Sequence, residues 1–145
     1  MFHYEMDPTR SIEAFLNRLD RVDERTENAA AAAVEAAGDT ITEKQRQLCP
    51  VRTGKLKSKI HRGKAYKNKS GNYTVRCGLD FKRDPDVRGA AVSAEFGRDG
   101  GTNRRGQTVP PQRATPFIRP GADAAREEAA RRMEDVFFRE VGLNE

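Results

Sequence analysis

The sequence predicts an α+β fold: a long N-terminal helix, a small antiparallel sheet of three to four strands with a long loop, and a C-terminal helix packed on the same sheet. Three observations predict it. Apolar residues recur three or four positions apart over residues 9–48 and again after residue 120, they alternate with polar residues within 58–96, and a loop rich in Gly, Arg and Pro follows. At 145 residues the chain fits one domain, 1–145.

Residues 9–48 are expected to form one long helix or a pair of helices. The apolar spacing fits one helical face, and a run of five alanines adds strong helix propensity. Pro8 suits the first turn of a helix. Gly38 is the expected place for a break or bend, and Pro50 ends the helix. Residues 1–8 are expected to be a flexible start.

Four strands are expected in the middle of the chain. Residues 73–79 alternate apolar and polar side chains, as a half-buried strand does. A hairpin turn at 68–72 joins this strand to a weaker one over 59–67. Two further short strands are expected at 90–96 and 114–118.

The long loop, residues 97–113, is expected to be mobile, because it has almost no apolar content. A loop of this length in a compact domain is usually functional, so its arginines, Arg98, Arg104 and Arg105, are candidate docking residues. After Pro120 the helical spacing returns, and Gly142 provides a natural stop.

The composition indicates a thin core and an uneven charge. Charged residues make up 34% of the chain and hydrophobic ones 36%, many of them alanine, and there is no Trp. Such a core is expected to gain burial from partner subunits. Residues 49–120 carry 17 basic and 5 acidic residues, whereas the flanks carry 10 basic and 17 acidic ones, so the net charges are +12 and −7. This split favours either nucleic acid or complementary contacts between copies.

No catalytic or metal-binding pattern is visible. Cys49 and Cys77 make no CxxC pair, two histidines complete no zinc set, and the two thiols are expected to be reduced. Asp80, Asp84 and Asp86 are interleaved with Lys, Arg and Pro and lack the Gly and Glu of a calcium loop. We therefore expect no catalytic residue, no metal, no cofactor and no enzymatic activity. No apolar stretch is long enough to span a membrane, so no membrane partner is expected.

A basic stripe follows the predicted first helix. Residues 52–69 contain eight Lys or Arg and no acid. Six of them form the candidate stripe: Arg52, Lys55, Lys57, Lys59, Arg62 and Lys64. On an extended chain Lys55, Lys57 and Lys59 would share one face, which could follow a phosphate backbone. The other interpretation is a charged face toward solvent or a neighbouring subunit. The sequence shows no recognition helix and no aromatic stacking platform, so only non-specific DNA binding is considered.

Three short motifs stand in order along the chain. The first contains a turn at Thr53 and Gly54 and two residues that re-enter the core, Leu56 and Ile60. Its motif positions are Pro50, Thr53, Gly54, Leu56 and Ser58. The second is Glu95, Phe96 and Gly97 before the loop, and the third is Pro116, Phe117 and Pro120 after it. Phe96 and Phe117 are expected to be core anchors. Glu95 is expected either to pair with the basic stripe or to be an ordinary exposed strand glutamate.

The order and spacing of these motifs closely resemble the tail-completion and head–tail joining proteins of long-tailed, siphovirus-like phages and prophages, with relatives in gene-transfer agents. That family has a P-V-x-T-G-x-L-x-x-S-I segment, a V-E-F-G segment and a P-F-I-x-P-A segment. The resemblance covers roughly residues 12–141. It departs at Lys59, which is inserted after Ser58, at Ala94, which replaces an aliphatic residue, and at Gly121, which replaces alanine.

The resemblance implies a structural virion protein at the head–tail junction or tail end, formed in the host cytoplasm during assembly. It would form a homo-oligomeric ring, expected to be a hexamer, that completes or terminates the tail and joins it to the neck. Its partners would be itself, the neck or connector proteins, the tail-tube proteins and DNA passing through the channel. The alternative is a non-specific DNA-binding protein that uses the stripe within 52–69.

Overall fold

The computed structural model describes residues 8–142, and side chains from residue 23 onward. The predicted flexible start, 1–8, lies outside this range apart from Pro8. The α+β class is confirmed. The elements follow in this order: α1 (Pro8–Leu48), α2 (Lys55–Ser58), β1 (His61–Arg62), β2 (Tyr66–Lys67), β3 (Tyr73–Thr74), β4 (Cys77–Gly78), the 3₁₀ turn η1 (Pro85–Val87), α3 (Arg88–Phe96), β5 (Gly101–Thr102), β6 (Thr108–Val109) and α4 (Ile118–Val141).

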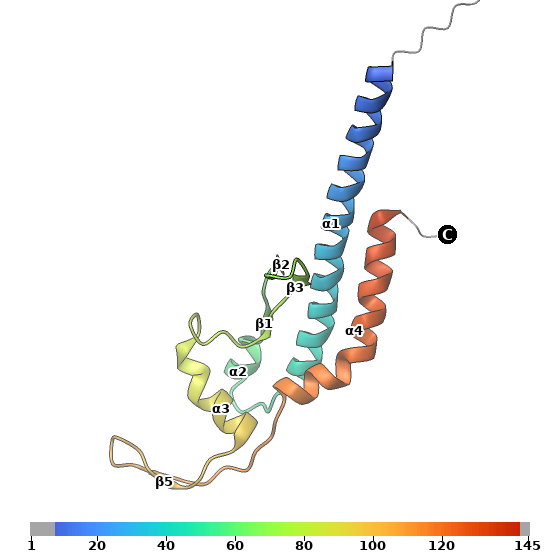
Figure 1. Ribbon diagram of the computed structural model, residues 1–145. Coiled ribbons are helices and arrows are strands. Elements are labelled where there is room, and N and C mark those ends of the chain that lie inside the picture. The colour runs from blue at the N-terminus through green and yellow to red at the C-terminus, as the bar shows by residue number, and fades with distance from the viewer. Residues whose placement is uncertain (1–7, 143–145) are drawn as a thin grey trace, which may run out of the picture.

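Helices α1 and α4 lie side by side and antiparallel, as Figure 1 shows. At one end the guanidinium of Arg25 donates to the Glu140 carbonyl at 3.0 Å, and at the other the Gln45 amide donates to the Ile118 carbonyl at 3.0 Å. The contact is closest at Gly121, where an added Cβ would lie 2.7 Å from Cα of Gln45. The helices approach this closely because small residues lie between them.

The alanine-rich, thin core expected from the composition is confirmed for the described part of the chain. Six of the eleven buried hydrophobic residues there are alanines: Ala29, Ala33, Ala91, Ala94, Ala125 and Ala129. Ile60 and Phe117 are the two large apolar side chains with no exposed surface. Each buried alanine removes little apolar area from water, so the fold depends on close helix contact more than on large side chains.

The prediction that the C-terminal helix packs on the sheet is wrong, because α4 packs on α1. The single sheet of three to four strands is also wrong; the described strands form three separate antiparallel pairs, β1–β4, β2–β3 and β5–β6. The first two pairs belong to one interrupted hairpin. Between them the N–H of Ala65 donates to the Glu35 carboxylate of α1 at 2.9 Å, which diverts the backbone from the ladder. The predicted turn at 68–72 is confirmed, because Asn68 Oδ1 accepts the N–H groups of Ser70 and Asn72.

The strands predicted at 90–96 and 114–118 are absent. The first segment lies in helix α3, and the second is extended chain that leads into α4. Ala91 and Ala94 are the buried residues of α3, three positions apart, which is helical spacing. A short alanine-rich apolar run fits either period, and the inward packing of Ala91 and Ala94 selects the helix here.

Gly38 does not break the first helix, since α1 is continuous to Leu48, one residue before Cys49 and two before Pro50. Its role is to admit the hairpin. A Cβ at this position would lie 2.8 Å from Cδ of Arg62 and 3.0 Å from Cγ1 of Val75. The missing side chain therefore lets the β1–β4 region pack against α1.

No helix within the described range is long and apolar enough to cross a membrane.

Candidate interaction surfaces

The three sequence motifs meet around Phe117. This ring packs in a buried cluster with Cys49, Ile60 and Ala94, and Leu56, Leu79 and Ile118 cover the cluster. The first motif contributes Leu56, the second is anchored by its neighbour Ala94, and the third contributes Phe117 itself. Segments that lie some forty and sixty residues apart in sequence thus form one junction. The prediction that Phe117 is a core anchor is confirmed.

Glu95 joins the second motif to the third by capping helix α4. One carboxylate oxygen accepts the N–H groups of Phe117 at 2.8 Å and Ile118 at 3.1 Å, and the other accepts that of Arg119 at 3.3 Å. Both expectations for Glu95 are therefore wrong: it lies on a helix and pairs with backbone N–H groups. Burial opposes its ionisation, but these three donors outweigh burial and lower the pKa of Glu95 below its ordinary value of 4.5.

Phe96 is 78% exposed, so the prediction that it is a core anchor is wrong. As part of helix α3 it points away from the side that carries Ala91 and Ala94. On a strand, alternation would have placed Phe96 on the same buried face as Ala94. On a helix, the three-residue spacing of Ala91 and Ala94 defines the buried face, and Phe96 lies outside it.

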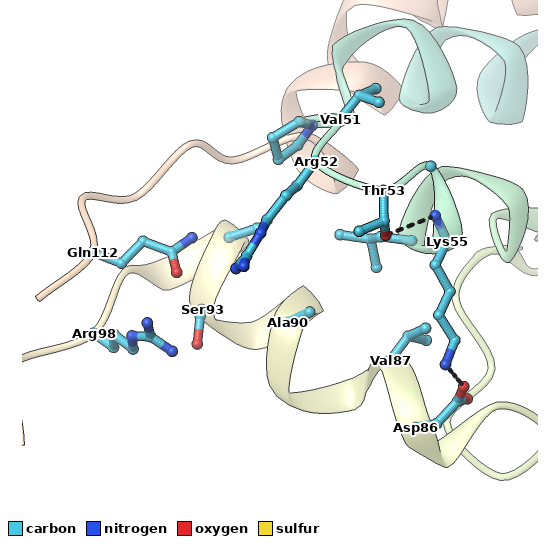
Figure 2. Close-up of a pocket in the computed structure, with 14 residues that line it drawn as sticks. Val51, Arg52, Thr53, Lys55, Asp86, Val87, Ala90, Ser93, Arg98 and Gln112 are labelled. Carbon is cyan, nitrogen blue, oxygen red and sulfur yellow. Dashed lines mark hydrogen bonds and ion pairs between the residues drawn. The ribbon is translucent and has the colours of Figure 1, made fainter. Parts of the chain in front are cut away.

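A cleft of about 400 Å³ lies beside the first motif. Gly54, with φ of 76°, turns the chain into α2, and the Thr53 hydroxyl accepts the Lys55 N–H at 3.4 Å. Figure 2 shows the Arg52 side chain extending from this turn across the cleft, with Arg98 on the opposite side. Helix α3 supplies the wall between them.

The charges in this cleft are unequal. Lys55 pairs with Asp86 at 2.5 Å, and that hydrogen bond lowers the pKa of Asp86 (Figure 2). Arg52 and Arg98 form no ion pair with the residues whose side chains are described. The cleft is therefore basic on both sides, and it suits an acidic or polar segment of a partner better than an apolar one.

The basic stripe is not an extended face. Lys55 and Lys57 lie in helix α2, so the shared orientation with Lys59 expected of an extended chain is wrong. Lys59 pairs with Asp84 at 2.7 Å, and Arg62 pairs with Asp39 at 2.6 Å and Glu35 at 3.1 Å.

Three members of the stripe, Lys55, Lys59 and Arg62, therefore neutralise acids of this chain. The hydrogen bond with Asp39 raises the pKa of Arg62 further. For the other three, Arg52, Lys57 and Lys64, no ion pair occurs within residues 23–142.

The segment predicted as a long loop contains a short hairpin, β5–β6, which we call the arm (residues 98–112). Its base is closed by two backbone hydrogen bonds of 2.9 Å between Arg98 and Gln112. At its tip Asn103 Oδ1 accepts the N–H groups of Arg105 and Gln107. Figure 1 shows the arm extending away from the α1–α4 pair, beyond α3, with the predicted docking arginines Arg104 and Arg105 between its strands.

The three aspartates that follow the hairpin act separately. Asp80 accepts the backbone N–H groups of Lys82 and Arg83, while Asp84 and Asp86 form the ion pairs described above. No cluster of three or more metal-ligating side chains exists among the described residues. Cys49 and Cys77 are free thiols, and burial raises the pKa of each.

Sequence reasoning missed the acidic partners of the stripe and the polar core. Asp84 is 6% exposed beside Lys59, and Gln45 is 2% exposed against α4. The alternating signs within DFKRDPD did not indicate these pairs, because Asp84 and Asp86 pair with Lys59 and Lys55, far earlier in the chain, and not with Lys82 or Arg83. No sequence pattern indicates that Gln45 is buried, because its burial depends on the packing of α4 over α1.

The part of the chain that the structure describes combines a helical hairpin, a thin core and a projecting arm. Residues 13–79 match the model of the HK97-gp10-like family, described as "Bacteriophage HK97-gp10, putative tail-component". This match is consistent with the phage tail-completion family that the motifs resemble. It spans α1 to β4 and includes the first motif. Searches of curated proteins and of solved structures found no match.

Proposed function

We propose that this protein is a tail-completion subunit that forms a ring at the head–tail junction of a phage-type particle and joins the tail to the neck. The family match supports the general assignment as a phage tail component. The arm is the observation that supports the more specific role as a subunit at the head–tail junction. A hairpin that extends from the body with two arginines at its tip is suited to reach a neighbouring subunit or ring.

The thin core supports a subunit role. With alanines forming most of the buried apolar positions, the monomer gains little hydrophobic stabilisation per residue. Exposed apolar side chains such as Phe96, Met133 and Phe138 remain available for burial against partners. Assembly then adds stability that the single chain lacks.

The mechanism is assembly around a channel, without a bond made or broken. A closed ring, expected to contain about six copies, needs heterologous contacts whose rotation closes. The basic middle and acidic flanks of the chain provide opposite charges for such contacts. The arm would contact the adjacent ring of neck or tail-tube protein, and DNA would pass through the channel without sequence readout. Such a subunit needs no catalytic group.

The test replaces both tip arginines, Arg104→Ala with Arg105→Ala, in cells that produce the particle. We expect filled heads and separate tails to accumulate, as counted by electron microscopy, because the arm no longer docks. The matched control is Arg126→Ala with Arg132→Ala, which also removes two exposed arginines but from α4. Absence of the protein from purified wild-type particles would overturn the proposed function.

A further inference from the structure

Four polar side chains gather in one half of the cleft beside the first motif. They are Arg52 from the turn before α2, Ser93 from α3, and Arg98 and Gln112 from the base of the arm, and all four line the cleft. In Figure 2 the Arg52 side chain reaches into the half of the cleft that holds the other three, and the ion pair described above lies at the opposite end. Three separate segments of the chain thus present polar groups to one space.

The hydrogen-bonding groups of these side chains are largely unused within residues 23–142. Nε of Arg98 donates to the Pro110 carbonyl at 3.2 Å, and its two terminal nitrogens have no partner among the described residues. Arg52, Ser93 and Gln112 make no side-chain hydrogen bond within the same range. A guanidinium presents its donors as a planar fork that matches the two oxygens of a carboxylate. This half of the cleft therefore offers two forks, a hydroxyl and an amide to one anion.

The cleft is positively charged when every residue that lines it is counted. Its charged residues are Arg52, Lys55, Asp86 and Arg98. Lys55 and Asp86 neutralise each other, so two cations remain in one space. Asp99 and Arg113 flank the base of the arm in sequence, but neither lines the cleft and their charges offset each other. Like charges that share a space repel, and an anion bound between them removes this repulsion.

The walls of the cleft favour a carboxylate carried by a peptide segment. Its volume of about 400 Å³ suits a few side chains, and its apolar lining residues include Val51, Leu56 and Val87. These residues suit the aliphatic part of an acidic side chain and an apolar neighbour. The end that holds the Lys55–Asp86 pair is electrically neutral. The cleft therefore accepts one anion better than the row of charges on a nucleic-acid backbone.

We propose that this half of the cleft is a carboxylate-binding site, in which Arg52 and Arg98 hold an aspartate or glutamate of an extended segment from a neck or tail protein. This inference rests on the proposed function, because it names the chemistry by which the ring recognises its neighbour. Ser93 and Gln112 donate further hydrogen bonds to the same carboxylate or to the peptide backbone beside it. Since Arg98 and Gln112 form the base of the arm, the bound acid also ties the arm to the first motif.

The test begins with an acetylated and amidated peptide, Gly-Leu-Glu-Leu-Gly, in which the glutamate is the one carboxylate. Heteronuclear NMR of the full-length protein, titrated with this peptide, follows the Nε–H signals of Arg52 and Arg98. We expect both signals to shift, with a Kd in the millimolar range. The same peptide with glutamine in place of glutamate should bind about tenfold more weakly, because it lacks the charge that strengthens these hydrogen bonds.

Variants of the protein connect this affinity to the two arginines. Arg52→Gln and Arg98→Gln should each weaken binding of the glutamate peptide about tenfold. Each should change binding of the glutamine peptide by less than about twofold, because no charged partner is left to lose. Arg52 is exposed, so Arg52→Gln should keep the wild-type circular dichroism even if Arg98→Gln, which loses the bond to Pro110, does not.

Lys57→Gln is the matched control for net charge. It removes one exposed cation from helix α2, next to the cleft, but Lys57 does not line the cleft. Binding of the glutamate peptide should therefore change by less than about twofold. A loss as large as that of Arg52→Gln would mean that the peptide responds to general charge, which contradicts a built site.

Other contrary results overturn the inference in recognisable ways. Equal binding of the glutamate and glutamine peptides would show that the cleft does not select a carboxylate. Tighter binding of a single-stranded oligonucleotide, lost in Arg52→Gln, would assign the site to nucleic-acid phosphates. Self-association of the wild type that Arg52→Gln abolishes in sedimentation velocity would assign the cleft to a second copy. In each case the particle experiment with the arm still decides the proposed function separately.

Discussion

At the residue scale, Glu95 holds two motifs together through charge. Its carboxylate accepts three backbone N–H groups at the start of α4, which would otherwise lack intrahelical partners. The negative charge also lies at the positive end of the helix dipole. A cap supplied by another helix, α3, fixes the relative position of both elements, which a cap within α4 could not do.

Substitution Glu95→Gln keeps the shape of this side chain but removes its charge, and should lower the free energy of unfolding at neutral pH by about 1–2 kcal/mol. The pKa of Glu95 is lowered in the folded state, so the charge stabilises the fold above the ordinary value of 4.5. This contribution is lost as the pH falls through the folded pKa. Urea unfolding at neutral pH and in acid should show the two proteins converging; a difference independent of pH would contradict the capping role.

Two phenylalanines that look equivalent in sequence should behave oppositely. Phe117 has no exposed surface, so Phe117→Ala should cost about 3–5 kcal/mol by leaving a cavity. Phe96 is mostly exposed, and Phe96→Ala should change the stability of the monomer by less than about 0.5 kcal/mol. Urea titrations at concentrations below self-association measure both; similar losses would mean that Phe96 is buried within one chain.

At the element scale, the contact between α1 and α4 depends on absent side chains. Gly121 and Gly38 both lie where a Cβ would meet another element within 3 Å, Gly121 against the backbone of Gln45 and Gly38 against the Arg62 side chain. At position 121 glycine is needed, because backbone cannot move aside as a flexible side chain can.

A pair of glycine substitutions tests this contact. Gly121→Ala should lower stability by about 1–3 kcal/mol, because the helices must separate, although alanine is the better helix former. Gly89→Ala in α3 is the matched control: its Cβ would meet nothing within 4 Å, so stability should rise by about 0.5–1 kcal/mol. Thermal melts of both variants measure this difference, and equal effects would disprove close packing at Gly121.

At the scale of the whole molecule, half of the eight cations in residues 52–69 are neutralised by acids of the same chain. Lys55, Lys59 and Arg62 pair with acids of α1 and of the segment before α3, and Lys67 pairs with Glu27. The uneven charge of the sequence therefore stabilises the packing of the hairpin and of α2 on their neighbours. Fewer unpaired cations are therefore available to bind DNA than the number of Lys and Arg residues in this segment suggests.

Binding to duplex DNA should accordingly be weak. Of the eight cations in 52–69, four lack an ion pair with a described side chain, so a DNA contact made by this stripe should give a slope of log K against log salt of no more than about 4 in magnitude. Fluorescence anisotropy at several salt concentrations measures it. Lys57→Ala with Lys64→Ala should reduce the slope by about 2, whereas Lys55→Ala should not. A steeper slope in the wild type would favour the DNA-binding alternative.

The sequence by itself determined the helical character of 9–48 and of the segment after 120, the turn at 68–72, the thin alanine core and the three motifs, because each depends on local spacing or composition. Only the tertiary structure decided the rest. The short run at 90–96 fits either period, and its helical form follows from packing Ala91 and Ala94 inward. The exposure of Phe96, the cap made by Glu95 and the contact of α4 with α1 all depend on segments distant in sequence, and local pattern carries no information about which of them meet.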